Sequence, residues 1–178
     1  GVIQEDGVHR GAHGVVAAAT QDQVFAAGTR LPPTVEWCGL RLSGIVCYDL
    51  RFPYLYRELA HAGATMLAIP SSFTVPTGQA HWHTLMRARA IETGCFVFAP
   101  AQVGTHKGSN RKTYGHSIAV APWGEVLADA GSEKAGFVIA DVDMAKIEEA
   151  RKMVPSLTHD RKYAAPTLHK AAVAKAAE

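Results

Sequence analysis

The length, composition and charge of the chain limit what it can be. Its 178 residues are enough for one domain with a sizeable core, and 48% of them are hydrophobic against 19% charged, which is typical of a globular protein. The formal net charge of +2 does not favour extended nucleic-acid binding or a role at a membrane surface. Apolar runs are interrupted before they reach the roughly 20 residues of a membrane-spanning helix. We therefore expect no nucleic-acid partner and no membrane partner.

The cysteines point to a compartment rather than to a disulfide scaffold. Cys38, Cys47 and Cys95 are an odd number and show no CxxC spacing, so neither a disulfide framework nor a four-cysteine zinc site is indicated. Residues 1–24 lack the positive and apolar regions of a secretory signal and predict no clear element of secondary structure. A reducing environment suits free thiols, and we expect a cytoplasmic protein.

The first clear pattern is a hairpin that ends on a cysteine. Residues 34–38 alternate like a half-buried strand, Gly39 supplies a turn, and residues 40–46 form the second strand, which ends at Cys47. Pro53 then suits the first turn of a helix over about residues 53–62. Backbone N–H groups and a helix dipole at such a junction favour a thiolate. A free cysteine is also a common buried hydrophobe, so this pattern alone leaves both interpretations open.

The following elements predict an α/β fold. A buried strand over residues 66–70 completes a strand–helix–strand unit, which implies a parallel crossover. The segment over residues 71–78 should leave that strand beside Cys47. A second long helix is expected over residues 79–93, with Gly94 as its C-cap. Its inward stripe is expected to consist of Trp82, Leu85, Met86 and Ala90.

The second half of the chain predicts shorter elements. A buried strand over residues 95–100 is followed by a glycine-rich, irregular loop over residues 104–113. Three more strands are expected over residues 117–121, 125–128 and 137–142, the first two joined by a turn. Asp143 can cap a helix that runs to about Met153, and the basic, alanine-rich sequence after Pro155 resembles an arm or tail.

Five segments together resemble the nitrilase superfamily. They are CYDLRFP at 47–53, SFTVPTGQAHW at 72–82, RARAIET at 87–93, YGHS at 114–117 and PWGEV at 122–126. The segments follow the order and usual spacing of that family over about residues 25–163. Within the superfamily, the chain is most similar to the Nit-type amidases, the group that includes omega-amidase and the deaminated-glutathione amidase.

The resemblance implies a fold and a chemistry. The implied fold is α/β, an αββα sandwich, and the implied reaction is attack of a cysteine on an amide or nitrile carbon, with ammonia released and a thioester then hydrolysed. Cys47 matches the nucleophile, and the N–H of Tyr48 is expected to be the backbone oxyanion donor. Arg51 either braces the turn with Asp49 or faces a substrate carboxylate.

The Nit-type resemblance also predicts a substrate site. By analogy with the Nit-type pocket, Phe73 and Thr77 should line the substrate cleft. The expected substrate is a small ω-amide or a compound similar to deaminated glutathione, and no cofactor is expected. The sequence does not specify which amide is cleaved.

The chain departs from the family pattern upstream of the cysteine. Family members use a glutamate base, a lysine on the oxyanion and usually a second glutamate, whereas this chain has no lysine before Lys107, and Gln21 occupies the place of the second glutamate. We therefore expect a domain over residues 1–163 whose first 24 residues are an atypical leader, followed by a basic, alanine-rich tail over 164–178. The N-terminal part of the fold is then incomplete, and exposed sheet surface favours a homodimer or higher homo-oligomer.

This departure keeps other hypotheses open. One is a catalytically impaired relative, or truncated product, that acts as a binding or assembly module. Another is a metal-dependent hydrolase using His81, His83, His106 or His116, but residues two apart on a helix point in different directions and the spacing matches no known ligand set, so we predict no metal site.

Two further groups of charged residues are expected at the surface. Arg87 and Arg89 should lie on the helix surface or in ion pairs, with Glu92 as a partner for one of them. The basic residues Lys107, Arg111 and Lys112 are expected to form a solvated loop, with anion binding as the alternative.

Overall fold

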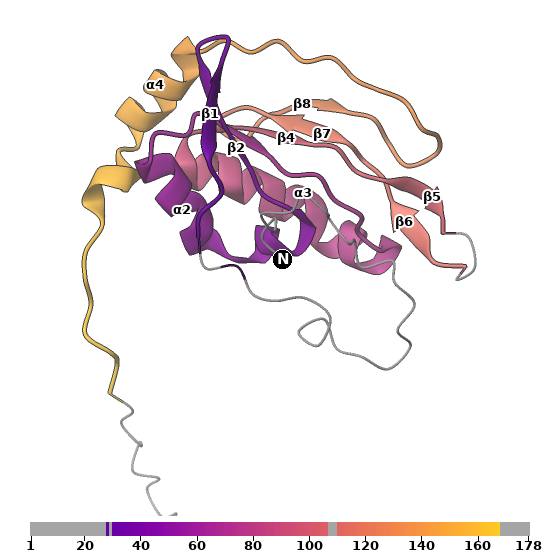
Figure 1. Cartoon of the computed structure of the whole chain (residues 1–178), viewed down its shortest axis with the longest axis horizontal. Coiled ribbons are helices and arrows are strands. Elements are labelled where there is room, and N and C mark those ends of the chain that lie inside the picture. The colour runs from indigo at the N-terminus through magenta and orange to yellow at the C-terminus, as the bar shows by residue number, and fades with distance from the viewer. Residues whose placement is uncertain (1–27, 29, 107–109, 168–178) are drawn as a thin grey trace, which may run out of the picture.

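A six-stranded mixed sheet organises the chain (Figure 1). The computed structural model describes residues 28, 30–106 and 110–167. The order of the strands across the sheet is β1, β2, β3, β4, β7, β8. Their bounds are β1 Thr34–Trp37, β2 Leu40–Gly44, β3 Met66–Ala68, β4 Phe96–Ala99, β7 Ile118–Val120 and β8 Val126–Asp129. Strands β2, β3 and β4 are parallel, and the other neighbouring pairs are antiparallel, which confirms the predicted α/β crossover.

The helices cover the two faces of this sheet unequally. Helices α2 (Pro53–His61) and α3 (Val75–Thr93) lie together against one face, and α4 (Ala145–Met153) lies on the other side (Figure 1). Because neighbouring residues of a strand point to opposite faces, Val97 joins the large core with Trp82 under α3, whereas Phe96 joins a small cluster with Ile147 of α4. Short 3-10 helices η1 (Cys47–Arg51) and η2 (Ser156–His159) complete the helical elements.

The predicted hairpin is confirmed, and its turn explains the register. Cys38 and Gly39 both have positive φ, of 48° and 77°, the backbone that a two-residue type I′ turn requires. Strands β1 and β2 therefore pair directly, with Trp37 opposite Leu40. Cys38 lies in this turn and is exposed, which corrects its expected place in the strand.

The second long helix begins four residues earlier than predicted. Pro76 lies in its first turn, where a missing N–H costs nothing, so the helix starts at Val75. Its inward stripe is as expected, with Trp82, Met86 and Ala90 buried and Leu85 packed against the core. Gly94 ends the helix in the left-handed conformation, as predicted.

Two predictions for the second half of the chain are wrong. The loop over residues 104–113 contributes to a hairpin of β5 (Val103–Thr105) and β6 (Lys112–Tyr114), because backbone pairing outweighs the glycine content. Residues 137–142 form no strand. Phe137 and Ile139 are 86% and 80% exposed, and in the part of the chain that the structure describes this alternating segment pairs with neither edge strand of the sheet.

Helix α4 agrees with the sequence, whereas the expected tail after Pro155 begins later, because Leu157 of η2 packs against the large core and Asp160 pairs with Arg57. Helix α4 reaches Met153 as expected, Ile147 faces inward, and Asp143 Oδ1 accepts the N–H of Ala145 at 3.0 Å. The segment after η2 is extended and exposed up to residue 167. The expected leader lies outside the described residues, and the predicted domain boundary at 163 stays a prediction.

The buried hydroxyl of Tyr56 in α2 allows a test of how the core contributes to stability. Its hydroxyl is buried and, among the described residues, has no hydrogen-bond partner, and burial raises the pKa of Tyr56 well above its ordinary value. An unpaired buried hydroxyl costs about 1–3 kcal/mol. Tyr56→Phe should therefore leave the free energy of unfolding unchanged or increase it by about 1 kcal/mol in urea titrations. A loss of more than about 1 kcal/mol would mean that the hydroxyl has a stabilising partner.

Candidate active site

Cys47 lies where the parallel strands of the sheet end. The chain leaves β2, and the N–H of Cys47 donates to the carbonyl of Pro70 at 3.0 Å, just beyond β3. The N–H of Ser71 donates in turn to Pro100, just beyond β4, at 2.9 Å. These bonds place the segment after β3 beside Cys47, as predicted. The carboxyl edge of a parallel sheet is where α/β proteins commonly bind ligands.

The backbone at Cys47 is held in an uncommon conformation. Its φ is +48°, in the left-handed region that residues other than glycine seldom adopt. Such strain persists where the surroundings fix it, and it is frequent at functional sites. Helix α2 begins at Pro53, as the sequence predicted, and Cys47 opens the additional short helix η1 that precedes it.

The N–H groups around Cys47 differ in whether the backbone already uses them. Those of Cys47 and Asp49 donate to the carbonyls of Pro70 and Val46. Tyr48 is the second residue of η1, and the first N–H groups of a helix have no acceptor within it. The role of the Tyr48 N–H as the oxyanion donor stays a prediction.

Arg89 fixes the segment that carries Cys47. The sequence placed Arg89 at the surface or in an ion pair, but its side chain is buried, with the residue only 4% exposed. Its Nε and Nη2 donate to the carbonyl of Leu50 at 3.0 and 2.6 Å, and its Nη1 pairs with Glu92 at 2.7 Å, the ion pair that the sequence predicted. The guanidinium also lies 5.1 Å from the ring of Tyr56. Arg89 thus joins α3, η1 and α2 through one cation.

Arg51 is the cation nearest in sequence to Cys47, and it faces the ring of Tyr48 and that of Phe73, which was predicted to line the cleft. Its guanidinium carbon lies 5.6 Å from the ring centres of both Tyr48 and Phe73. Its Nη1 lies 3.3 Å from Nδ1 of His81 on α3. Phe73 is buried against Trp82, with ring centres 5.0 Å apart. The structure therefore places Arg51 next to Phe73, as expected if both belong to one substrate site.

Thr77 has a different environment. It lies in the first turn of α3, where its hydroxyl oxygen is 2.8 Å from that of Thr74 and donates to the Thr74 carbonyl at 3.2 Å. A place in the substrate cleft stays a prediction for Thr77. A cavity of about 300 Å³ lies elsewhere, between the segment after β4, the β5–β6 hairpin and the segment after β8; its lining, taken from the described residues, includes Gln102, His106 and Lys134 but none of the predicted site residues.

The other two thiols differ from Cys47. Cys38 is exposed in the hairpin turn. Cys95 is buried, and its sulfur donates to the carbonyl of Ala64 at 3.2 Å while Arg151 Nη2 lies 3.2 Å away. Burial raises the pKa of the Cys95 thiol, which keeps it protonated and inert.

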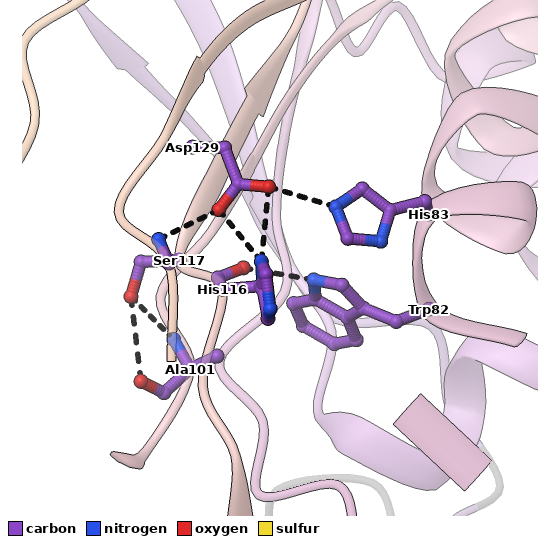
Figure 2. A network of polar contacts seen from close by, with 7 residues as sticks. Trp82, His83, Ala101, His116, Ser117 and Asp129 are labelled. Atoms are coloured by element: carbon purple, nitrogen blue, oxygen red, sulfur yellow. Dashed lines mark hydrogen bonds and ion pairs between the residues drawn. The ribbon is translucent and has the colours of Figure 1, made fainter. Parts of the chain in front are cut away.

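A polar network lies on the other side of Trp82 (Figure 2). His83 Nε2 and His116 Nδ1 lie 2.8 and 2.9 Å from the two carboxylate oxygens of Asp129, and Trp82 Nε1 donates to the His116 carbonyl at 2.8 Å. Burial opposes ionisation of Asp129, but hydrogen bonds from His83, from the Gly131 N–H and from His116 outweigh it and hold the pKa of Asp129 below its usual range. The sequence singled out His83 and His116 among its histidines but not Asp129, because the three residues come from α3, the segment before β7 and β8.

Comparison with known proteins identifies the family. A family model described as carbon-nitrogen hydrolase matches residues 7–152, most of the chain. The chain belongs to the carbon–nitrogen hydrolase family. The nitrilase-type α/β fold that the motifs implied is confirmed by solved structures of this superfamily.

The relatives are longer than this chain. A deaminated glutathione amidase from Synechocystis sp. is 46% identical over 134 residues, which are 75% of this chain and 48% of the relative. The structure of the Caenorhabditis elegans NitFhit protein matches with a TM-score of 0.69 and 40% identity, over 80% of this chain and 34% of that one. The chain thus spans about half, or less, of the carbon–nitrogen hydrolases that it matches.

One related structure concerns the reactivity of an active-site cysteine. A variant of an amidase from Nesterenkonia sp. matches with a TM-score of 0.60 and 30% identity, over 74% of this chain and 50% of that one. It is described as showing the Michael addition of acrylamide at the active-site cysteine. In that carbon–nitrogen hydrolase, therefore, a cysteine at the active site reacts with an electrophile.

The Arg89 contacts predict a large effect of a conservative substitution. A lysine at position 89 presents one ammonium group and cannot bond both Leu50 and Glu92 with the fork of a guanidinium. Arg89→Lys should lower the free energy of unfolding by about 1–3 kcal/mol, measured by urea denaturation.

Arg87→Lys is the matched control for this measurement. Arg87 is exposed on the same helix, and its Nε donates to the Gly124 carbonyl at 2.8 Å. Its replacement should change stability by no more than about 0.5 kcal/mol. Equal losses for the two variants would contradict a special role of Arg89.

Proposed function

We propose that this protein hydrolyses the C–N bond of a small amide, with Cys47 as the nucleophile. The observation that carries the proposal is the strained backbone of Cys47, at φ +48°, at the carboxyl edge of the parallel strands. The amidases among its relatives, and the reactive cysteine in one of them, support the same chemistry. The proposed substrates are an ω-amide or a compound similar to deaminated glutathione.

The proposed reaction has two halves. The Cys47 thiolate attacks the amide carbon and forms a tetrahedral intermediate, whose oxyanion accepts a hydrogen bond from the N–H of Tyr48. The C–N bond then breaks, the nitrogen gains a proton and leaves as ammonia, and a thioester on Cys47 remains. Water attacks the thioester, which releases the carboxylic acid and restores the thiol. No redox cofactor is needed, because no atom changes its oxidation state.

Arg51 and Phe73 are proposed to hold the substrate. A guanidinium binds a carboxylate through two parallel hydrogen bonds, and Arg51 has its planar group between two aromatic rings and beside His81. Phe73, packed on Trp82, offers a rigid apolar wall. Thr77 is retained in this proposal as a substrate-binding residue at the start of α3.

A second candidate function rests on a departure from the family pattern. The resemblance implies a lysine upstream of the cysteine, and residues 1–106 of the given sequence contain none. Loss of an oxyanion donor or a general base lowers rates by about two to four orders of magnitude. A catalytically impaired relative that acts as a binding or assembly module is therefore the alternative. A folded chain that releases no ammonia from any small amide would favour it.

The assembly and location of the protein are also proposals. In the described part of the chain, no helix combines the length and apolar character needed to cross a membrane. We infer a cytoplasmic homodimer or higher homo-oligomer. The exposed aromatic and aliphatic side chains of β1, Val35 and Trp37, support association, since they lie on an edge strand of the sheet.

Rates of alkylation can distinguish a cysteine that is activated as a nucleophile from one that is only exposed to solvent. If exposure alone decided, iodoacetamide would modify the exposed Cys38 before the half-buried Cys47, and Cys95 last. A cysteine held as a nucleophile reacts faster than an ordinary exposed thiol, so we expect Cys47 to react about tenfold faster than Cys38. Peptide mass spectrometry over time measures both rates. Faster modification of Cys38 would count against Cys47 as the nucleophile.

Turnover tests the function itself. Cys47→Ser should abolish ammonia release from an ω-amide substrate, while Cys38→Ser should retain the wild-type rate. The two variants make the same chemical change, and the second lies in an exposed turn. Ammonia is measured by a coupled enzymatic assay. Activity of Cys47→Ser equal to that of wild type would refute the proposed mechanism.

A further inference from the structure

His83, His116 and Asp129 form a three-residue cluster outside the proposed amidase site. Each offers one ligand atom, and these three atoms lie within 4.8 Å of one another. Oδ2 of Asp129 is 2.8 Å from His83 Nε2 and 3.0 Å from His116 Nδ1. Tetrahedral ligands with bonds of about 2.1 Å lie roughly 3.4 Å apart, so the two histidine–carboxylate separations need to widen by about half an ångström. The two histidine nitrogens, which lie up to 4.8 Å apart, have to come closer to receive the same ion.

The cluster is supported by the groups around it. Asp129 Oδ1 accepts the N–H of Gly131 at 2.8 Å, which orients the carboxylate. The ring of Tyr114 stacks on His116 at 4.3 Å, and the His83 ring stands edge-on to His116 at 5.2 Å. Neighbours that fix the orientation of ligands are characteristic of metal sites.

The backbone of His116 is an independent observation. Its φ is +59°, and the preceding Gly115 has a φ of 72°, so two successive residues are left-handed. The His116 N–H donates to the Gly131 carbonyl at 2.7 Å, and its carbonyl accepts from Trp82, so both sides of the residue are held. This strained conformation directs the imidazole toward Asp129 and His83 (Figure 2).

We propose that His83, His116 and Asp129 bind a divalent first-row transition ion. Two imidazoles and one carboxylate form the ligand set of many sites for Zn²⁺ and Fe²⁺ that keep open positions for water. The three side chains are 22–34% exposed, so an ion can enter and keep water ligands. The ion would tie α3 to β8 and to the segment before β7.

The cluster also forms a hydrogen-bonded network without an ion, and the two states differ in their protons. In that network His83 Nε2 and His116 Nδ1 donate to Asp129. A bound ion needs the lone pairs of these nitrogens, so the ring protons move to the opposite nitrogens, which face away from the carboxylate. The metal site does not rest on the proposed amidase function, and its test uses no activity measurement.

Zn²⁺ titration of the whole chain by calorimetry tests the site. We expect one saturable site with a dissociation constant below about 100 µM. In His83→Gln the glutamine amide can still donate to Asp129, but the imidazole ligand is lost. Asparagine was chosen at position 116 because it tolerates the left-handed backbone there. These variants and Asp129→Asn should each weaken Zn²⁺ binding at least about tenfold. Zn²⁺ should also raise the Tm of wild type but not that of the variants.

His61→Ala is the matched control. His61 Nε2 lies 2.7 Å from Asp160, in an exposed cluster whose other member is Arg57 rather than a second histidine. Its removal should leave Zn²⁺ affinity unchanged. Absence of a saturable site below about 100 µM, or equal affinities for wild type and His83→Gln with circular dichroism showing a folded variant, would overturn the proposal.

Discussion

The paired hydrogen bonds from Arg89 to the Leu50 carbonyl hold the proposed active site in place. A left-handed cysteine at a strand end is unfavourable, so the residues after it have to be fixed from outside. Arg89 does this from the middle of α3, and Glu92 balances its charge. A buried cation without these partners would be strongly destabilising, which makes the position of η1 dependent on α3. The large core under α3 therefore determines where Cys47 lies, although Trp82, Met86 and Cys47 are far apart in the sequence.

The same helix serves two regions with different chemistry. On the side of η1, aromatic contacts run from Trp82 through Phe73 to Arg51, which follows Cys47 by four residues. On the side of β8, His83 contacts Asp129, and Trp82 donates to His116. Trp82 and His83 are adjacent in sequence but face different partners, because successive residues of a helix are turned by about 100°. The proposed amide-cleaving site and the proposed ion-binding site thus share one rigid element.

Much of the fold followed from local patterns, and much of the site did not. The hairpin, the parallel crossover and the inward stripe of α3 were predictable because alternation, turn residues and helical spacing report burial directly. The strand expected over residues 137–142 is absent, because alternation reports the pattern of side chains along a segment and not whether its backbone pairs with a neighbouring strand. Cys47 is assigned as the nucleophile through its motif. The burial of Arg89 and the grouping of His83, His116 and Asp129 depend on long-range packing instead. A helix sequence rich in arginine is equally consistent with a solvated surface, so it does not report which arginine is buried.

The most direct test of the account is to trap the acyl-enzyme. The whole chain is mixed with an ω-amide substrate, and the reaction is quenched in acid within seconds. The protein is then digested, and its peptides are mapped by mass spectrometry. The account predicts a thioester of the substrate's acyl group on the peptide that contains Cys47, and its loss when hydroxylamine is added. An acyl adduct on Cys38 instead, or a folded chain that forms none with any small amide, would contradict the assignment of Cys47 as the nucleophile.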